Sequence, residues 1–531
     1  MSEARTRTDA AGVIRRADEL RSARVQHEPV WRDCYRMTYP LRGAGIASEV
    51  VHSETAQSRV ADALSSVASD SVRILASAMM TGLTPPSARW FDLYVDGASD
   101  AEARWLDECS DLVWQAIHSS NYDAVAYEAM LDVLVAGWAA LYVAEGDDGG
   151  LVCEVWPVGE VYLAQSRPHG MVDVVYRRVS LSAAQAVAVY GADALTDHMR
   201  RTAEDRPHER FEFVIAIEPE TGGGRWPVRS VHVSLDGPRV VRESGYYTMP
   251  VIVPRWTSIP GSAYAHGPVF DALPNIRMLN ELRRMHIAHA EIDIAPPMLA
   301  INDGVLNART VKLGPRKVIV VNSVESLRPL QTGGNWQLSY QEQDYLERSI
   351  RRSLLADQLQ PQDGPAMTAT EVHVRVGLVR QLLGPVSGRM QPELLAPLIG
   401  RVFDLAWRSG TLPPPPRTLE GREFVPKYLS PMARSQRLDD VAAMERLYAQ
   451  VAAMAEMKPG ALDLLNEDEM VRESGRALGV PTKVLRAGDE VEEYRRLRAE
   501  EARERETAAA QDQLAAQAAS AAVEQAAVAP A

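Results

Sequence analysis

One stretch, residues 365–406, decides the fold: PAMTATEVHVRVGLVRQLLGPVSGRMQPELLAPLIGRVFDLA. Its apolar residues recur at helical intervals, which predicts one very long helix. Thr368 precedes Glu371 by three residues, the spacing of a capping box at a helix start. We expect a kink at Gly384 and Pro385, because proline lacks the amide hydrogen and its ring crowds the preceding turn. Nothing in the stretch resembles catalytic machinery, so the sequence predicts a mechanical element.

The composition is that of an ordinary globular protein with a large core. The chain has 531 residues, room for roughly three domains by length. Hydrophobic residues make up 46% and charged residues 24%. The net charge of -14 argues against tight, sequence-independent binding of nucleic acid over the whole surface, since such binding needs clustered Lys and Arg. A local basic lining remains compatible with this charge.

Cysteine usage and hydropathy bear on the compartment. Cys34, Cys109 and Cys153 are far apart and form no C-x-x-C pair, which fits buried thiols in a reducing compartment. The N-terminal residues lack the apolar segment of a signal peptide. No run approaches the roughly 18 apolar residues of a membrane helix, so we expect no membrane insertion. The sequence predicts a protein made and kept in a cytoplasm, or in something assembled there.

The chain alternates between helical and β-rich regions. Helical patterns cover residues 12–39, 58–82, 101–117 and 123–136, and RWFDLYV predicts a short strand after the second of them. A β-rich lobe follows, with a hairpin at GDDGG and one helix near SAAQAVAVYG. After residue 264 the pattern is helical again, apart from short strands and turns within 297–336 and a proline-rich break at TLPPPP.

The search for enzyme chemistry finds two weak candidates. Asp147 and Asp148 could hold a metal, but Asp-Gly turn chemistry explains them equally well. His286 and His289, with Glu291 nearby, have a spacing that zinc ligands use. We favour a polar helix surface there, because no cysteine or third histidine completes the set. With no phosphate-binding loop and no G-x-S-x-G elbow in the chain, we expect neither catalysis, nor a cofactor, nor a metal.

Arginines are concentrated on two helices that flank the 297–336 segment. These arginines could lie on solvent-exposed helix faces together with acidic residues, which is the simplest interpretation for an isolated monomer. Because the two helices flank one insertion, we expect them to run antiparallel and side by side. Neither helix is apolar all round, so the two together would make a poor core. We therefore expect them to pack against copies of themselves in a ring. The arginines are Arg277, Arg283 and Arg284 on the first helix and Arg348, Arg351 and Arg352 on the second.

Several segments together resemble the portal (head-to-tail connector) protein family of short-tailed, podovirus-type bacteriophages. They include SVRILASAMMTGLTPPSARWFDL, YEAMLDVLVAGWAALYVAEGD and VPRWTSIPGSAYAHGPVFDALPNIRMLNEL, and they continue through EIDIAPPMLA into the opening stretch. The set covers roughly residues 12–430 in the family's order and fades after about residue 433. Each segment alone is moderately specific, but their order is a strong signal.

The resemblance implies an α+β portal fold, assembled as a ring of about twelve subunits around a central channel. The helix pair would be a stem, and the long kinked helix would be a strut across the ring. The implied parts are a wing at 1–268, stem helix 1 at 269–293, a clip at 294–336, stem helix 2 at 337–358, a tunnel loop at 359–367, the kinked wing and crown helix at 368–430, a crown at 431–490 and an Ala-rich tail at 491–531.

The implied channel passes double-stranded DNA, so its wall must not hold phosphates tightly. We expect an acidic ring with few basic lumen positions to guide DNA and let it slide. The channel-facing candidates are Arg283, Arg284, Arg351 and Arg352 on the stem helices and Gln360, Gln362 and Asp363 in the tunnel loop. The tail could form a helical barrel or stay floppy. After Thr507 it has few large apolar residues, so we expect a frayed helix at best.

The implied function is a portal at one capsid vertex of the virion, through which DNA is packaged and later ejected, and which connects head to tail. The implied partners are the terminase motor, capsid and scaffolding proteins, tail adaptor proteins and double-stranded DNA, with assembly in the host cytoplasm. Two alternatives remain open at this point: a metal-dependent nuclease using Asp147 and Asp148, and a smaller tail adaptor protein.

Overall fold

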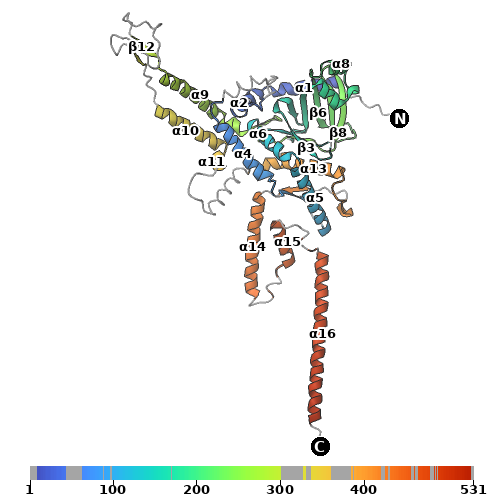
Figure 1. Cartoon of the computed structure of the whole chain (residues 1–531). Coiled ribbons are helices and arrows are strands. Elements are labelled where there is room, and N and C mark those ends of the chain that lie inside the picture. The colour runs from blue at the N-terminus through green and yellow to red at the C-terminus, as the bar shows by residue number, and fades with distance from the viewer. Residues whose placement is uncertain are drawn as a thin grey trace, which may run out of the picture. The chain divides into compact units, whose positions relative to one another are not determined.

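The computed structural model describes most of the chain (Figure 1). The described residues are 9–43, 63–87, 89–95, 99–146, 148–168, 170–300, 327–329, 336–359, 384, 386, 388–419, 425–428, 431–455, 460, 464–478, 484, 486 and 488–527. They form a mixed α and β structure in two units. The first unit comprises Met1–Arg89 and Val113–Thr411, and the second comprises Trp90–Leu112 and Leu412–Ala531.

Three helices of the first unit pack together as a helical core, whereas the N-terminal helix packs against the β-rich lobe. The apolar side of α4 is fully buried at Val72 and Leu75, and α4 packs against both α2 and α6. The single helix predicted for 12–39 is wrong: the chain turns after α1, and Pro29 lies in the first turn of α2, where proline is tolerated. The helices are α1 (Ala10–Arg24), α2 (Glu28–Thr38), α4 (Val67–Leu83) and α6 (Tyr122–Val135), with α5 (Asp100–Ser119) contributing to both units.

The predicted β-rich lobe is a five-stranded antiparallel sheet with helices on both faces. Its order is β4-β5-β6-β7-β8. Successive residues of a strand point to opposite faces, so Val214 packs with α1 whereas Phe213 packs with α7 and α8. The strands are β4 (Val161–Ala164), β5 (Val174–Ser182), β6 (Arg210–Pro219), β7 (Val228–Ser234) and β8 (Arg239–Tyr246).

The lobe has one helix more than predicted. α7 (Ala183–Tyr190) corresponds to SAAQAVAVYG, and a full capping box at Ser182 and Gln185 begins it. α8 (Asp197–Asp205) follows the short η2 (Ala192–Ala194), and the Thr196 side chain caps it. α8 has only nine residues, too few for a clear helical period in the sequence.

A smaller sheet joins the lobe to the helical core. It has the order β3-β2-β9, from β2 (Ala140–Glu145), β3 (Leu151–Trp156) and β9 (Val251–Ile252). The predicted hairpin at GDDGG is confirmed by the β2–β3 pairing and by the Gly146 amide, which donates to the Gly150 carbonyl at 2.7 Å. The remaining short elements of this region are η1 (Val158–Glu160), β10 (Thr257–Ser258) and β11 (Ala265–His266).

The two predicted stem helices are present. α9 (Pro268–Ile294) begins after Gly267, which is extended, and ends just before Pro296 and Pro297. Of the intervening segment the structure describes the pair β12 (Met298–Ala300) and β13 (Leu327–Pro329). α10 (Trp336–Ser353) is separated from α11 (Ala356–Leu359) by Leu355, whose φ of 58° is left-handed. The single second stem helix predicted for 337–358 is therefore broken near its end.

The opening stretch is helical over its described part. Gly384, Val386 and residues 388–390 are helical, followed by a π-helical turn, η4 (Gln391–Leu395), and by α13 (Ala396–Arg408). Pro385 and residues 365–383 lie outside the described residues, so the predicted kink stays a prediction. The π turn is an irregularity that the sequence did not indicate.

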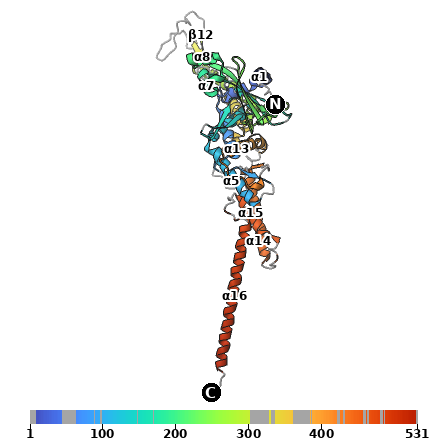
Figure 2. The ribbon, with the colours of Figure 1, turned by 90° about the vertical axis from the view of Figure 1, so that its right-hand side faces the viewer.

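The described residues of the second unit form one small sheet, three helices and the first part of α5. β1 (Phe91–Tyr94), the predicted RWFDLYV strand, pairs antiparallel with β14 (Val425–Tyr428). α16 is a continuous helix of 40 residues (Figure 2), so the expectation of a frayed helix after Thr507 was wrong. Its Ala, Glu, Gln and Arg residues favour helix intrinsically. The other elements are α14 (Pro431–Ala455), α15 (Glu467–Leu478) and η5 (Arg417–Leu419).

Candidate functional site

The helix pair formed by α9 and α10 carries the predicted channel residues. The two helices lie side by side (Figure 1). The Asn275 amide donates to the Ser349 hydroxyl at 3.0 Å, and further along α9 the His286 ring contacts Ser339. Residues further along α9 contact residues earlier in α10. The two helices therefore run antiparallel, which confirms the prediction. Ile350 of α10 is fully buried, and α10 also packs against α4.

Glu347 of α10 collects two of the four candidate arginines. Its Oε1 accepts hydrogen bonds from Arg283 Nη2 and from Gln343 Nε2, both at 2.9 Å. Arg351 Nη2 lies 4.0 Å from the other carboxylate oxygen. Partial burial alone would raise the pKa of Glu347, but the hydrogen bonds from Gln343 and Arg283 and the two arginine charges outweigh it and lower this pKa. The negatively charged Glu347 carboxylate therefore lies between the guanidinium groups of Arg283 and Arg351.

The other two candidate arginines are more exposed. The Nε of Arg284 lies 3.8 Å from Glu281, one helical turn away, and both side chains are more than half exposed. Such a pair contributes little stability and leaves the cation accessible. The Arg352 side chain is exposed, and within the described part of the chain it forms no ion pair. Arg277 and Arg348 instead pair with Asp33 and Asp344.

The tunnel-loop candidates lie outside the described residues. These are Gln360, Gln362 and Asp363, and α11 ends at the residue before them. Gly384 is helical, and a Cβ added there would meet open space, so neither strain nor crowding requires a glycine at that position. The roles assigned to these residues remain predictions.

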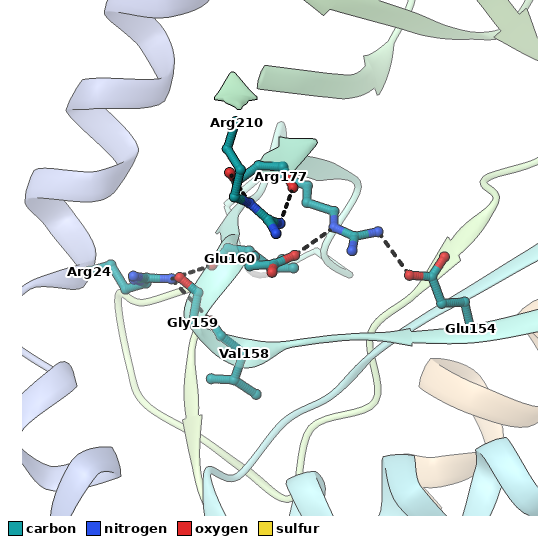
Figure 3. Close-up of polar contacts among 9 residues, drawn as sticks. Arg24, Glu154, Val158, Gly159, Glu160, Arg177 and Arg210 are labelled. Carbon is teal, nitrogen blue, oxygen red and sulfur yellow. Dashed lines mark hydrogen bonds and ion pairs between the residues drawn. The ribbon is translucent and has the colours of Figure 1, made fainter. Parts of the chain in front are cut away.

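Buried arginines, which the sequence did not single out, fasten the β-rich lobe to the helical core. Arg24 at the end of α1 is 3% exposed, and its Nη1 donates to the carbonyls of Val158, Gly159 and Val161 at 2.8–3.0 Å (Figure 3). Its Nη2 pairs with Glu28 at 2.8 Å. Lysine could not replace this planar group, because several acceptors use its fork of donors at once.

Arg177 on β5 forms ion pairs with acidic side chains of the same subunit. It pairs with Glu160 through Nε at 2.9 Å and with Glu154 through Nη1 at 3.1 Å (Figure 3). Arg210 on β6 donates to the Ser180 carbonyl at 2.7 Å. These guanidinium groups are committed to contacts within the subunit, so they offer no clustered basic surface for nucleic acid.

A second buried arginine contact fixes the π turn. Arg255 and Glu393 are 5% and 9% exposed, and the Glu393 carboxylate accepts from the backbone amide, Nε and Nη2 of Arg255 at 2.7–3.0 Å. One turn into α13, the Nε of Arg401 donates to the Val143 carbonyl at 3.1 Å, and Nη1 to the Thr248 hydroxyl, also at 3.1 Å. The helical segment from 391 onward is thus held firmly against the strands of the first unit.

The candidates for metal chemistry do not come together. Across the described residues, no group of three or more His, Cys, Asp or Glu side chains is placed to hold a metal ion. His289 is 3.2 Å from Asp293 and His286 contacts Ser339, so the two histidines serve different partners. Asp148 is exposed, and Asp147 lies outside the described residues. No helix in the described part of the chain has the length and apolar character of a membrane span.

Comparison with known proteins identifies the family. The model of the family "Bacteriophage head to tail connecting protein" matches residues 10–485, and the chain belongs to this family. The "Probable portal protein" of Bordetella phage BPP-1 is 26% identical over 93% of this chain and 92% of its own length. The portal protein of Salmonella phage epsilon15 has the same identity and coverage, and that of Enterobacteria phage T3 is 22% identical over 72% of each chain.

One solved structure, described as "Neck of empty GTA particle computed with C6 symmetry", contains a chain that aligns with 78% of this chain and 90% of its own. The identity is 14% and the TM-score is 0.34, a likeness too low to support an argument about fold or assembly.

Family membership settles the class of protein. The resemblance read from the sequence is confirmed, and the chain is a phage head-to-tail connector of the portal type. It is a structural component of the virion and not an enzyme, so the nuclease alternative is set aside. The match to portal proteins over nearly their full length also sets aside the smaller tail adaptor.

Proposed function

We propose that this connector forms a closed ring of about twelve copies at one capsid vertex, with α9 and α10 lining a channel for double-stranded DNA. The observation that carries the proposal is the exposed helix pair itself. From Glu281 onward no residue of α9 is buried, yet Met285, Ile287 and Ile294 present large apolar side chains to solvent there. Such a pair gains stability when copies of it are packed around an axis.

The charges of the pair suit a channel through which DNA moves. Arg283 and Arg351 share Glu347, and Arg284 lies near Glu281, so three of the four candidate arginines have an acidic neighbour. Each phosphate neutralised by a protein cation adds affinity through release of counterions. Arginines that are already partly neutralised attract DNA weakly, which permits it to slide. Cyclic symmetry would repeat each of these side chains as a collar around the axis.

The remaining parts of the proposal follow from the family. The ring would receive DNA from the terminase motor during packaging and release it at infection. It would contact capsid and scaffolding proteins on the head side and tail adaptor proteins on the other, after assembly in the host cytoplasm. The segment 359–367 would be the tunnel loop, with Gln360, Gln362 and Asp363 facing the lumen and no Lys or Arg among its residues.

Two measurements test the proposal. Native mass spectrometry of the purified protein should show rings, and a stable monomer at every concentration would refute the ring. The second measurement is DNA packaging and retention in particles carrying a fourfold alanine variant. The test variant changes Arg283, Arg284, Arg351 and Arg352, and the control changes four exposed lobe arginines, Arg201, Arg206, Arg239 and Arg242.

Both variants should form rings, because the changed side chains are at the surface. The test variant should package or retain DNA poorly and the control should behave as the wild type. Normal packaging by the test variant, or failure of its ring to form, would show that these arginines are not channel contacts.

A further inference from the structure

An exposed apolar stripe runs along α9. Met278, Met285 and Ile292 are 53%, 58% and 37% exposed. They are seven residues apart, so they lie on nearly the same side of the helix. α9 meets α10 through Asn275 and Arg283, which lie on another side of the helix. Large apolar side chains gathered along one side of a helix mark an interaction surface rather than a solvated face.

α10 presents a different outward face. Tyr345 is 65% exposed, and Gln341, Arg348 and Arg352 lie on the same side at helical spacing, all exposed. The residues of α10 that meet α9 and α4 lie on other sides of the helix. Each helix therefore turns toward its partner with one side and away from it with another, which gives the pair two separate outward faces.

The two outward faces complement each other in apolar character and in charge. The α9 stripe is apolar and includes the exposed carboxylate of Glu281 between Met278 and Met285. The α10 face offers an aromatic ring that methionine packs against well, and two arginines that suit a carboxylate. A face that complements a different face of the same molecule produces a head-to-tail contact, which closes into a ring when the rotation permits.

We propose that the α9 stripe of one copy packs against the Tyr345 face of α10 in the next copy. This inference rests on the proposed ring and names the surfaces that close it. Asn275 lies opposite Ser349 and His286 opposite Ser339, so Met278 is at the level of the turn from Tyr345 to Arg348. With the helix pair running along the ring axis, rotation about that axis leaves this level unchanged, and Met278 then meets Tyr345 of the neighbouring copy.

One consequence concerns Arg352. Arg352 lies on the same side of α10 as Tyr345, two turns further along the helix. The proposed contact between copies therefore covers it. The candidates for DNA contact then narrow to Arg283, Arg284 and Arg351. An exposed arginine at the edge of that contact contributes little to its stability, so replacing Arg352 alone should leave both ring formation and DNA retention unchanged.

Disulfide trapping in the full-length protein tests the contact. The three native cysteines are buried, so the wild type gives a low background. Met278→Cys and Tyr345→Cys are made separately and together. Under mild oxidation neither single variant should crosslink, a mixture of the two should give dimers, and the double variant should give a ladder ending at the closed ring. The matched control pairs Tyr345→Cys with Ile287→Cys, which is 57% exposed on another side of α9 and should give no ladder.

The outcomes separate this inference from the proposed function. Rings seen by native mass spectrometry without a ladder in the double variant would overturn the inference and leave the ring standing. Strong crosslinking of Met278→Cys with itself would do the same, because it would mean a two-fold contact. If the wild type forms no ring, the proposed function fails, and the named surfaces fail with it.

A second variant does not depend on the exact distance between thiols. Met278→Asp should prevent ring formation, since it replaces the apolar packing of methionine on the Tyr345 ring with a small hydrated group, whereas Ile287→Asp should not. Circular dichroism of both variants verifies that the subunit remains folded. Normal rings from Met278→Asp would overturn the inference.

Discussion

The buried pair of Arg255 and Glu393 offers a prediction whose size follows from the structure. Glu393→Gln keeps the shape of the side chain and removes its charge, which leaves the Arg255 guanidinium, 6% exposed, without a counterion in the interior. The nearest other charged group to this carboxylate is Arg389, at 3.8 Å, which is also a cation. Removal of one partner from a buried pair costs about 3–5 kcal/mol, because the remaining charge stays desolvated.

The assay is urea unfolding followed by tryptophan fluorescence, at one fixed protein concentration because assembly also contributes to stability. Glu393→Gln should lower the transition midpoint strongly. The control, Glu212→Gln, breaks the exposed pair with Arg178 at 2.7 Å and should cost less than about 1 kcal/mol. The double variant Arg255→Met with Glu393→Gln removes both charges, keeps an acceptor for the backbone amide of residue 255, and should recover most of the loss.

Equal midpoints for Glu393→Gln and Glu212→Gln would refute the reasoning, since the buried pair would then behave like a surface pair. If the double variant does not recover stability, the lost free energy of unfolding comes from altered packing and not from the unpaired charge of Arg255.

Two further predictions concern the lobe and the tail. Burial, and then the charge of Arg242, lower the pKa of His232 to about 4, so as pH falls from 6.5 toward 4 the unfolded chain binds a proton that the folded chain does not. Stability should fall over that interval by about 1.4 kcal/mol per pH unit from this group, and His232→Gln should show a shallower fall in urea unfolding; parallel curves would contradict this. Deletion of residues 508–531 should leave ring formation intact, because the ion pair that joins α16 to α15, Arg495 with Asp468, precedes the cut. Loss of the ring in native mass spectrometry would show that the end of α16 packs after all.

The elements that sequence reasoning placed well have local signals at their ends. α9 was expected at 269–293 and observed at Pro268–Ile294, because the Gly267-Pro268 start and the following pair of prolines are encoded where the helix begins and ends. The hairpin at GDDGG was equally clear, since turn chemistry alone requires it. The antiparallel helix pair followed from chain connectivity.

The features that the sequence did not reveal depend on distant partners. β1 pairs with β14, more than 300 residues away, and no local period predicts such a partner. Glu393 looked like one charge on a helix until Arg255 was placed against it. Leu355 breaks α10 from α11 in a left-handed conformation that usually calls for glycine, so its sequence carries no sign of the turn.

For the channel-facing candidates, the sequence indicated positions but not contacts. The four stem arginines were found by their position on two flanking helices, but their spacing could not tell which of them shares an acid. Only the packing of α9 on α10 brings Arg283 and Arg351 to one carboxylate. Long side chains at a surface have several possible partners, and tertiary structure decides among them.

The burial of Cys34, Cys109 and Cys153 has a consequence for the life of the particle outside the cell. Burial raises the pKa of each thiol to about 12, so almost none is present as the reactive thiolate near neutral pH. A virion leaves a reducing host and persists in oxidising surroundings, where exposed thiols would form bridges between neighbouring subunits. This connector can cross between the two redox environments without a change in its covalent structure.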